Sequence, residues 1–235
     1  MKRILSVSPA VFCVLYVFFP LCRSVGAFSG YDFVLRDLSV FIVGLTVISV
    51  AACVLLLFLK LPLSKVQTVF CALLPLFAAV NGLFLILDSR WKATGLFALI
   101  CYACSVILLV KFTRRSVWKI GSVVLSVLLA AVLLFSSLIS FIFGDLGQKT
   151  VVKSAASPRN TYLAEVIDDN QGALGGDTHV DVWTVGKTVD LFLCKFSKSP
   201  VCVYTGKWGE FGTMRLSWRD EHTLVINGTN YDVRG

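Results

Sequence analysis

Side chains with oxygen or nitrogen ligand atoms gather between residues 168 and 181. They are Asp168, Asp169, Asn170, Asp177, His179 and Asp181, and glycines are interspersed among them. Oxygen ligands in a glycine-rich loop suit Ca²⁺, but this spacing lacks the fixed ligand order and terminal Glu of an EF-hand. Asx residues and glycines also form ordinary turns. We therefore favour a structured surface loop that forms a ligand or loop site, and we expect no metal or other cofactor.

Two pairs of cysteines have spacings that could serve a disulfide bond, redox chemistry or metal binding. Cys194 and Cys202 would face each other if their segments form a β-hairpin, and an oxidising compartment would then permit a disulfide. The strand register decides between this bond and two free thiols. Cys101 and Cys104 form a C-x-x-C motif, which in soluble folds indicates redox chemistry or zinc. Here the motif lies in an apolar run without a nearby histidine, so we interpret these cysteines as small apolar packing residues.

His179 and His222 are the only histidines. No recognisable motif ties a serine or a cysteine to either of them, so the sequence gives no support for a hydrolase triad. We accordingly expect a protein that is not an enzyme.

Five long apolar runs surround these residues. The chain has 235 residues, of which 57% are hydrophobic and only 15% charged, against about 25% charged in soluble domains. A membrane-spanning helix needs roughly 20 apolar residues, and only helices satisfy their own backbone hydrogen bonds in lipid. We predict transmembrane helices at Ile4–Cys22, Leu38–Leu59, Val66–Leu87, Ala93–Val110 and Ile120–Gly144.

Lys and Arg in the short loops predict the orientation of the helices. One side carries eight basic residues and no acid: Lys2, Arg3, Lys60, Lys65, Lys111, Arg114, Arg115 and Lys119. The other side mixes basic residues with Asp32, Asp37 and Asp88. The positive-inside rule places the N-terminus in the cytoplasm and the region after Gly144 outside the cell membrane.

The first apolar run has a second interpretation. Lys2-Arg3, the apolar run and Val25-Gly26-Ala27 are similar to a signal peptide with a small-residue cleavage site. We favour a retained helix because the run is long for a signal peptide, and either alternative leaves the C-terminal region outside.

The predicted spans contain few polar features. No ionisable residue lies within them, which argues against a proton-coupled transporter or an ion pump. Asn81 in the third span is the membrane polar site, and we favour an interhelical hydrogen bond over a broken helix that lines a cavity. Ser122, Ser126 and Ala130 recur every four residues in the fifth span and suggest close helix packing, including a homo-oligomer.

After residue 148 the pattern changes to alternating apolar and polar residues, which predicts β-strands. The expected strands are Thr161–Asp168, His179–Val185, Val189–Phe196, Val201–Tyr204, Thr213–Trp218, Thr223–Ile226 and Thr229–Val233. Asn227-Gly228 predicts a tight hairpin between the last two. We therefore expect a transmembrane domain at 1–148 and, at 149–235, a small antiparallel sandwich or partly open barrel.

The positive charge does not indicate nucleic acid. Residues 1–144 carry 12 Lys and Arg and 3 acidic residues, whereas residues 145–235 carry 10 and 11. The excess of +8 therefore lies between the apolar runs, where it sets topology, and the large polar region is nearly neutral.

Short motifs in the last third of the chain carry a resemblance. They are Ser157-Pro-Arg-Asn-Thr-Tyr162, Gly172-Ala-Leu-Gly-Gly-Asp177 and Trp218-Arg-Asp-Glu-His-Thr-Leu-Val-Ile-Asn-Gly228. The region resembles a family of small membrane-anchored proteins, mostly from Gram-positive bacteria, whose activity is uncharacterised. The resemblance implies anchoring helices and an external β domain, and it supplies no catalytic residues.

These observations favour a multi-pass membrane protein that presents an external β domain as a non-enzymatic binding or sensing module. Its expected partners are the lipid bilayer and an unknown envelope partner or peptide. One alternative is a small channel or transporter component with the β domain as a cap. Another is a membrane effector gated by ligand binding to the β domain.

Overall fold

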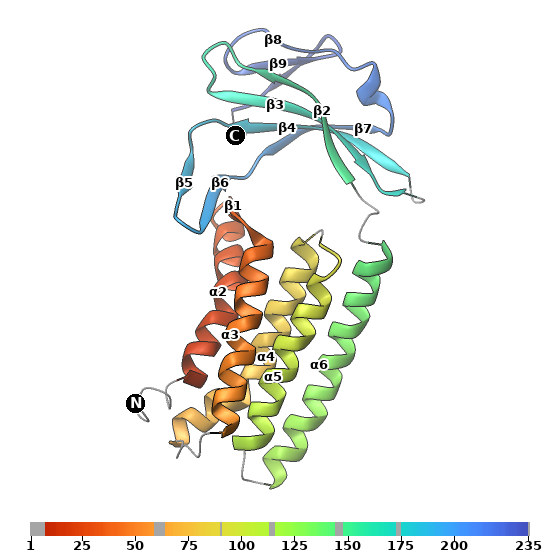
Figure 1. Cartoon of the computed structure of the whole chain (residues 1–235). Coiled ribbons are helices and arrows are strands. Elements are labelled where there is room, and N and C mark those ends of the chain that lie inside the picture. The colour runs from red at the N-terminus through yellow and green to blue at the C-terminus, as the bar shows by residue number, and fades with distance from the viewer. Residues whose placement is uncertain are drawn as a thin grey trace. The chain divides into compact units, whose positions relative to one another are not determined.

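The computed structural model describes residues 8–58, 64–89, 91–112, 116–143, 148–172 and 175–234. In these residues, five helices with one short strand between the first two are followed by antiparallel β-strands (Figure 1). The helices are α2 (Ser8–Phe28), α3 (Leu38–Phe58), α4 (Lys65–Asp88), α5 (Thr94–Phe112) and α6 (Ser116–Phe143). Each is long and apolar enough to cross a membrane. The predicted fold class, a helical membrane bundle followed by a β domain, is confirmed.

Polar contacts near the helix ends show that the helices alternate in direction. Arg23 near the end of α2 forms an ion pair of 2.8 Å with Asp88 at the end of α4. Lys111 in the last turn of α5 donates from Nζ to the carbonyl oxygen of Leu56 near the end of α3. The ends of α2 and α4 therefore share one side, and the ends of α3 and α5 share the other. Most of the basic residues that predict which side is cytoplasmic lie outside the described residues or have side chains that are not described.

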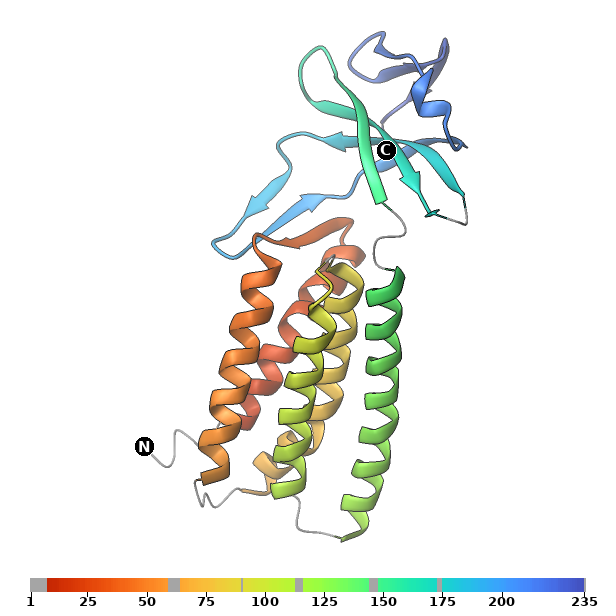
Figure 2. The same cartoon turned by 45° about the vertical axis from the view of Figure 1, so that its right-hand side comes forward.

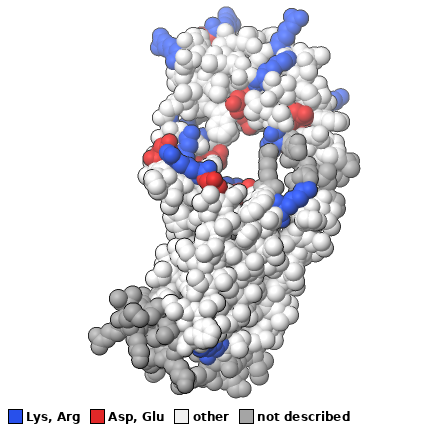
Figure 3. Space-filling model, in the orientation of Figure 1, with Lys and Arg blue, Asp and Glu red and all other residues white. Residues whose placement is uncertain are grey.

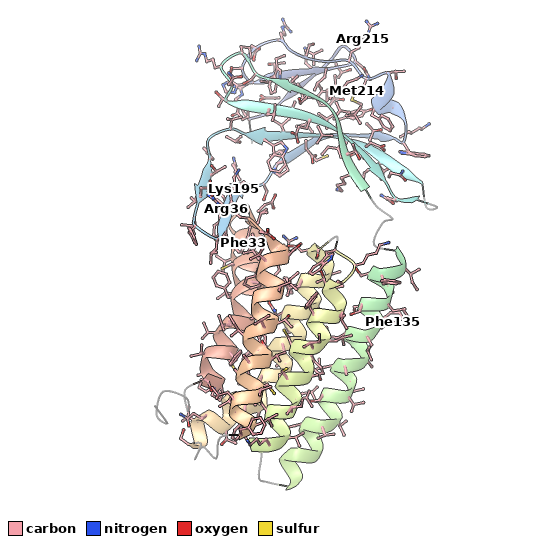
Figure 4. All side chains as sticks on the ribbon, in the orientation of Figure 1. Phe33, Arg36, Phe135, Lys195, Met214 and Arg215 are labelled. Carbon is pink, nitrogen blue, oxygen red and sulfur yellow. The ribbon has the colours of Figure 1, made fainter. Side chains whose placement is uncertain are left out.

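The helices bury one face in a common core and leave the rest for lipid. Tyr16, Leu74 and Leu133 belong to the core, whereas Phe135 on α6 is 66% exposed and points away from the bundle (Figure 4). Such an apolar exterior is stable only in a bilayer. The charged residues visible in Figure 3 accordingly gather over the β-strands and near the helix ends.

Small residues allow close contact between α4, α5 and α6. A Cβ added at Gly95 would lie 2.7 Å from the Cβ of Ser137, and one added at Gly82 would lie 3.1 Å from the Cβ of Ala98. In the predicted small-residue stripe, Ser126 is buried, and its carbonyl oxygen accepts a hydrogen bond from the Tyr102 hydroxyl on α5. This part of the stripe therefore packs within the chain.

The β-strands form three antiparallel sheets, none of them closed. Their orders are β2-β3-β4-β7, β10-β9-β8 and β1-β6-β5, and Figure 2 shows the strands from a second direction. The strands are β1 (Tyr31–Leu35), β2 (Gln148–Ala156), β3 (Tyr162–Asn170), β4 (Gly176–Thr184), β5 (Thr188–Asp190), β6 (Cys194–Lys198), β7 (Val201–Lys207), β8 (Leu216–Trp218), β9 (Thr223–Ile226) and β10 (Thr229–Asp232). The first two sheets share one core, which includes Val166, Val180, Met214 and Leu224.

The predicted β9–β10 hairpin is confirmed in detail. Ile226 pairs with Thr229, and the two loop residues, Asn227 and Gly228, have φ values of 50° and 87°. Positive φ at both positions is what a type I′ turn requires.

Strand β1 is a feature that the sequence analysis missed, because it lies between the first two transmembrane helices. It pairs with β6. The chain therefore divides into a helical unit of residues 1–25 and 35–144 and a β unit of residues 26–34 and 145–235. The expected single boundary after residue 148 leaves out this early segment of the β unit.

Two further strand assignments differ from expectation. Strand β2 covers Gln148–Ala156, for which no strand was predicted. The predicted strand Val189–Phe196 is instead two short strands, β5 and β6, joined by a turn in which the Leu191 N–H donates to the Cys194 carbonyl oxygen.

Candidate functional site

The β2-β3-β4-β7 sheet has one apolar face and one polar face. Ala164, Val166, Val180 and Val182 point into the core shared with the β10-β9-β8 sheet. Side chains alternate along a strand, so the residues between these positions lie on the opposite face. We call this opposite face the polar face.

Three registered rows of residues cross the polar face. The first is Lys149, Asp169, Asp177 and Lys207; the second is Val151, Ile167, His179 and Thr205; the third is Ser154, Glu165, Asp181 and Cys202. Like charges directly opposite each other are destabilising in a sheet. In the first row, Lys149 pairs with Asp169 and Lys207 pairs with Asp177. Lys149 Nζ lies 3.2 Å from Asp169 Oδ2. In the third row, Glu165 and Asp181 stand opposite each other without a basic residue in the row.

A thiol, an imidazole and a carboxylate meet between these rows. His179 Nε2 lies 3.6 Å from Asp169 Oδ2, and Cys202 Sγ lies 4.0 Å from His179 Nδ1, at the outer limit of a hydrogen bond to sulfur. Thr205 Oγ1 is 3.3 Å from the same ring nitrogen and 3.6 Å from the sulfur. The Cys202 thiol also lies 3.4 Å from the Tyr204 carbonyl oxygen, to which it donates. This arrangement holds an exposed thiol beside a base.

Sequence reasoning missed Cys202 as a neighbour of His179. The register of β4 and β7 shifts between Val180 and Asp181, so that Val180 pairs with Tyr204 while Asp181 pairs with Cys202. The irregularity leaves Val203 without a partner in the register and places Cys202 on the polar face. No glycine lies among Cys202, Val203 and Tyr204, so the sequence carries no dependable signal for this irregularity.

The residues of the predicted ligand or loop site separate into three groups. Asp169 and His179 come together, and Asp177 and Asp181 lie beside them on β4. Asp168 instead accepts a hydrogen bond of 3.0 Å from Trp208 Nε1, and Asn170 Oδ1 accepts one of 2.8 Å from the Gly172 N–H. Ala173 and Leu174 lie outside the described residues. Over the described residues, no group of three or more His, Cys, Asp or Glu side chains is placed to hold a metal ion.

The proposed pairing of Cys194 and Cys202 is not what the structure contains. Cys194 lies on β6, which pairs with β1 and β5, whereas Cys202 lies on β7, which pairs with β4. The hairpin that the disulfide alternative requires is therefore absent, and both thiols are free, as in the other alternative, although only Cys194 is buried. Cys194 is buried and Cys202 is exposed.

Asn81 on α4 is 2% exposed, and its Oδ1 has no hydrogen-bond partner among the described residues. An interhelical hydrogen bond was expected of Asn81, and its Oδ1 does not make one with the described residues. Other buried polar groups of the bundle bond to each other. The Tyr16 hydroxyl lies 3.0 Å from Ser49 Oγ, and Thr46 Oγ1 lies 3.4 Å from Cys101 Sγ. Asn81 Oδ1 is thus a buried acceptor without a partner among the described residues.

Two motifs behind the family resemblance meet in space. Glu221 accepts hydrogen bonds from Ser157 Oγ at 2.6 Å and from the Arg159 N–H at 2.7 Å. The Tyr162 ring stacks on Trp218 with centroids 6.2 Å apart. These contacts fasten the turn before β3 to the segment between β8 and β9, which is a structural role.

Comparison with known proteins found no match. No protein-family model matches the chain, and neither does any curated protein or solved structure.

Thiol labelling tests the placement of the two outer cysteines. We expect a maleimide to label Cys202 in the folded protein, with or without reductant, because this thiol is free and exposed. Cys194 should react only after unfolding, because burial and then the charge of Asp190 raise the pKa of its thiol. Peptide mass spectrometry of wild type and of a Cys202→Ser control gives the readout. Labelling of both cysteines only after reduction would show a disulfide instead.

The Glu221 contacts predict a pH-dependent stability. Desolvation opposes the charge of Glu221, but hydrogen bonds from Ser157, Thr161 and Arg159 outweigh it and lower the pKa from 4.5 to about 2. A lowered pKa stabilises the fold above pH 4.5, and this contribution is lost as the pH falls toward 2.

Glu221→Gln should therefore unfold at lower denaturant than wild type at pH 7, and the difference should shrink between pH 4.5 and 2. Tryptophan fluorescence of the detergent-solubilised protein during urea unfolding measures it. A difference that stays constant over this pH range would show that the ionised carboxylate is not the cause.

Proposed function

We propose that this chain is a multi-pass protein of the cell envelope whose β unit lies outside the membrane and acts as a non-enzymatic binding module. The outer location rests on the eight basic residues and absence of acids in the loops of the opposite side. The family resemblance of the last third of the chain agrees with an anchored external domain, and an origin in bacteria belongs to the same proposal.

The observation that carries the binding role is the pair Glu165–Asp181 in the third row of the polar face. Two carboxylates directly opposite each other weaken a sheet unless a positive group compensates them. The first row contains its own lysines, but the third row does not. A bound amine or guanidinium would supply the missing positive charge.

The indole of Trp183, which neighbours this pair, could also contribute to binding a cation. Trp183 Nε1 donates a hydrogen bond of 2.8 Å to Glu165 Oε2, which fixes both side chains. Carboxylates form strong charge-assisted hydrogen bonds with amines and guanidinium groups, and an indole attracts cations to its face. We therefore propose a basic peptide or a basic protein surface as the partner.

Binding of a fluorescent oligolysine peptide to the full-length protein in nanodiscs tests this function. The double variant Glu165→Gln/Asp181→Asn should lose at least about tenfold in affinity, or about 1.4 kcal/mol. The matched control Asp190→Asn/Asp232→Asn removes the same charge from β5 and β10 and should bind as wild type does.

Equal weakening in both double variants would mean that the peptide responds only to net charge. That result, or the absence of binding by wild type at low salt, would contradict the proposed site.

A further inference from the structure

The turn between β5 and β6 exposes a run of large apolar side chains. Phe192 at this turn is 90% exposed and Leu193 is 62% exposed, and Val189 and Leu191 are also exposed. We call residues 189–193 the apolar tip. Isolated exposed apolar residues are common on soluble surfaces, but four large ones within residues 189–193 indicate an interaction surface.

The β5–β6 hairpin is tied to a strand that enters and leaves the membrane. Helix α2 ends at Phe28, β1 covers Tyr31–Leu35, and α3 begins at Leu38. Both of these helices are long and apolar enough to span a bilayer. An extended residue advances by about 3.3 Å, so no residue of β1 is more than roughly 17 Å of chain from a helix end.

Contacts between β1 and β6 fix the direction of the hairpin. The Ser199 N–H donates to the Gly30 carbonyl oxygen at 3.0 Å, and Ser199 Oγ donates to Asp32 Oδ1 at 2.9 Å. Further along, the rings of Phe33 and Phe196 lie 5.0 Å apart. Residue numbers therefore rise along β1 in the direction in which they fall along β6, so the two strands are antiparallel. Figure 4 labels Phe33 on β1 and Lys195 on β6. The apolar tip therefore lies toward the Leu35 end of β1, from which the chain enters α3.

The charges beside the tip suit a lipid headgroup region. Lys187, Lys195 and Lys198 flank the tip, and Asp190 within the tip is the one acidic residue between positions 187 and 198. The headgroup layer is roughly 5–8 Å thick on each side of the hydrocarbon. Apolar residues with basic neighbours are typical of segments that lie in this interface.

We propose that the apolar tip of the β5–β6 hairpin inserts into the bilayer interface, as a lipid-binding contact of the β unit. The lipid surface is the occupant that chain continuity with α2 and α3 favours. The contact would limit the motion of the β unit at the membrane surface. This inference does not depend on the proposed basic partner.

Spin labelling of the full-length protein in vesicles of phosphatidylcholine and phosphatidylglycerol tests the proposal. Phe192→Cys and, separately, Leu193→Cys are labelled in a Cys202→Ser background. Thr229→Cys, beside the turn of the β9–β10 hairpin, is the matched control because Thr229 is also exposed. Collision rates with oxygen, which concentrates in lipid, and with a water-soluble nickel chelate are compared.

The oxygen-to-nickel ratio at residues 192 and 193 should exceed that at residue 229 several-fold. A ratio equal to that of the control would place the tip in water and overturn the proposal. Protection of the tip from both reagents would also overturn it, because it would indicate a protein contact such as a second copy of the chain.

Discussion

The pairing of β1 with β6 is the constraint on which the arrangement of this chain depends. Both ends of β1 lead into membrane-spanning helices, and its hydrogen-bonded neighbour lies more than 150 residues later in the sequence. A bilayer cannot separate paired strands, so residues 29–37 and the C-terminal strands share one side. Four helices, α3 to α6, lie between β1 and β2. An even number of crossings returns the chain to the same side, as the pairing requires.

The same constraint explains how polar and apolar groups are distributed. In the bundle, Tyr16, Ser49 and Thr46 find partners inside the protein, because lipid offers none. In the β unit, the polar face keeps charged rows that a membrane interior would exclude. A sheet supported by the core around Val166 and Leu224 holds those rows at fixed spacing. This rigidity is what a binding surface needs, since little order must be created when a partner binds.

Much of the fold could be predicted from local signals, whereas the site could not. Charge-free runs identify the five helices, and Asn227-Gly228 identifies its turn, because each signal lies within the element itself. Alternation in Tyr31–Leu35, with Phe33 and Leu35 buried, is a similar signal for β1. A five-residue segment between two spans is equally compatible with a loop, so this signal alone does not predict a strand. The neighbours of His179 depend on register and on the irregularity at Val203, and the Cys194–Cys202 hypothesis was wrong about strand partners for the same reason.

Cross-linking of β1 to β6 tests the central claim most directly. In the full-length protein, Phe33→Cys and Phe196→Cys are combined with a protease site inserted after residue 146, and Phe33→Cys alone is the control. The Gly30–Ser199 backbone hydrogen bond and the ring contact of Phe33 with Phe196 make positions 33 and 196 neighbours on paired strands, where facing Cβ atoms are about 4.5–5.5 Å apart. We predict that, after oxidation and cleavage, the two fragments of the double variant run as one band on a non-reducing gel and separate on reduction. Separation of the fragments without reductant, as in the control, would contradict the pairing.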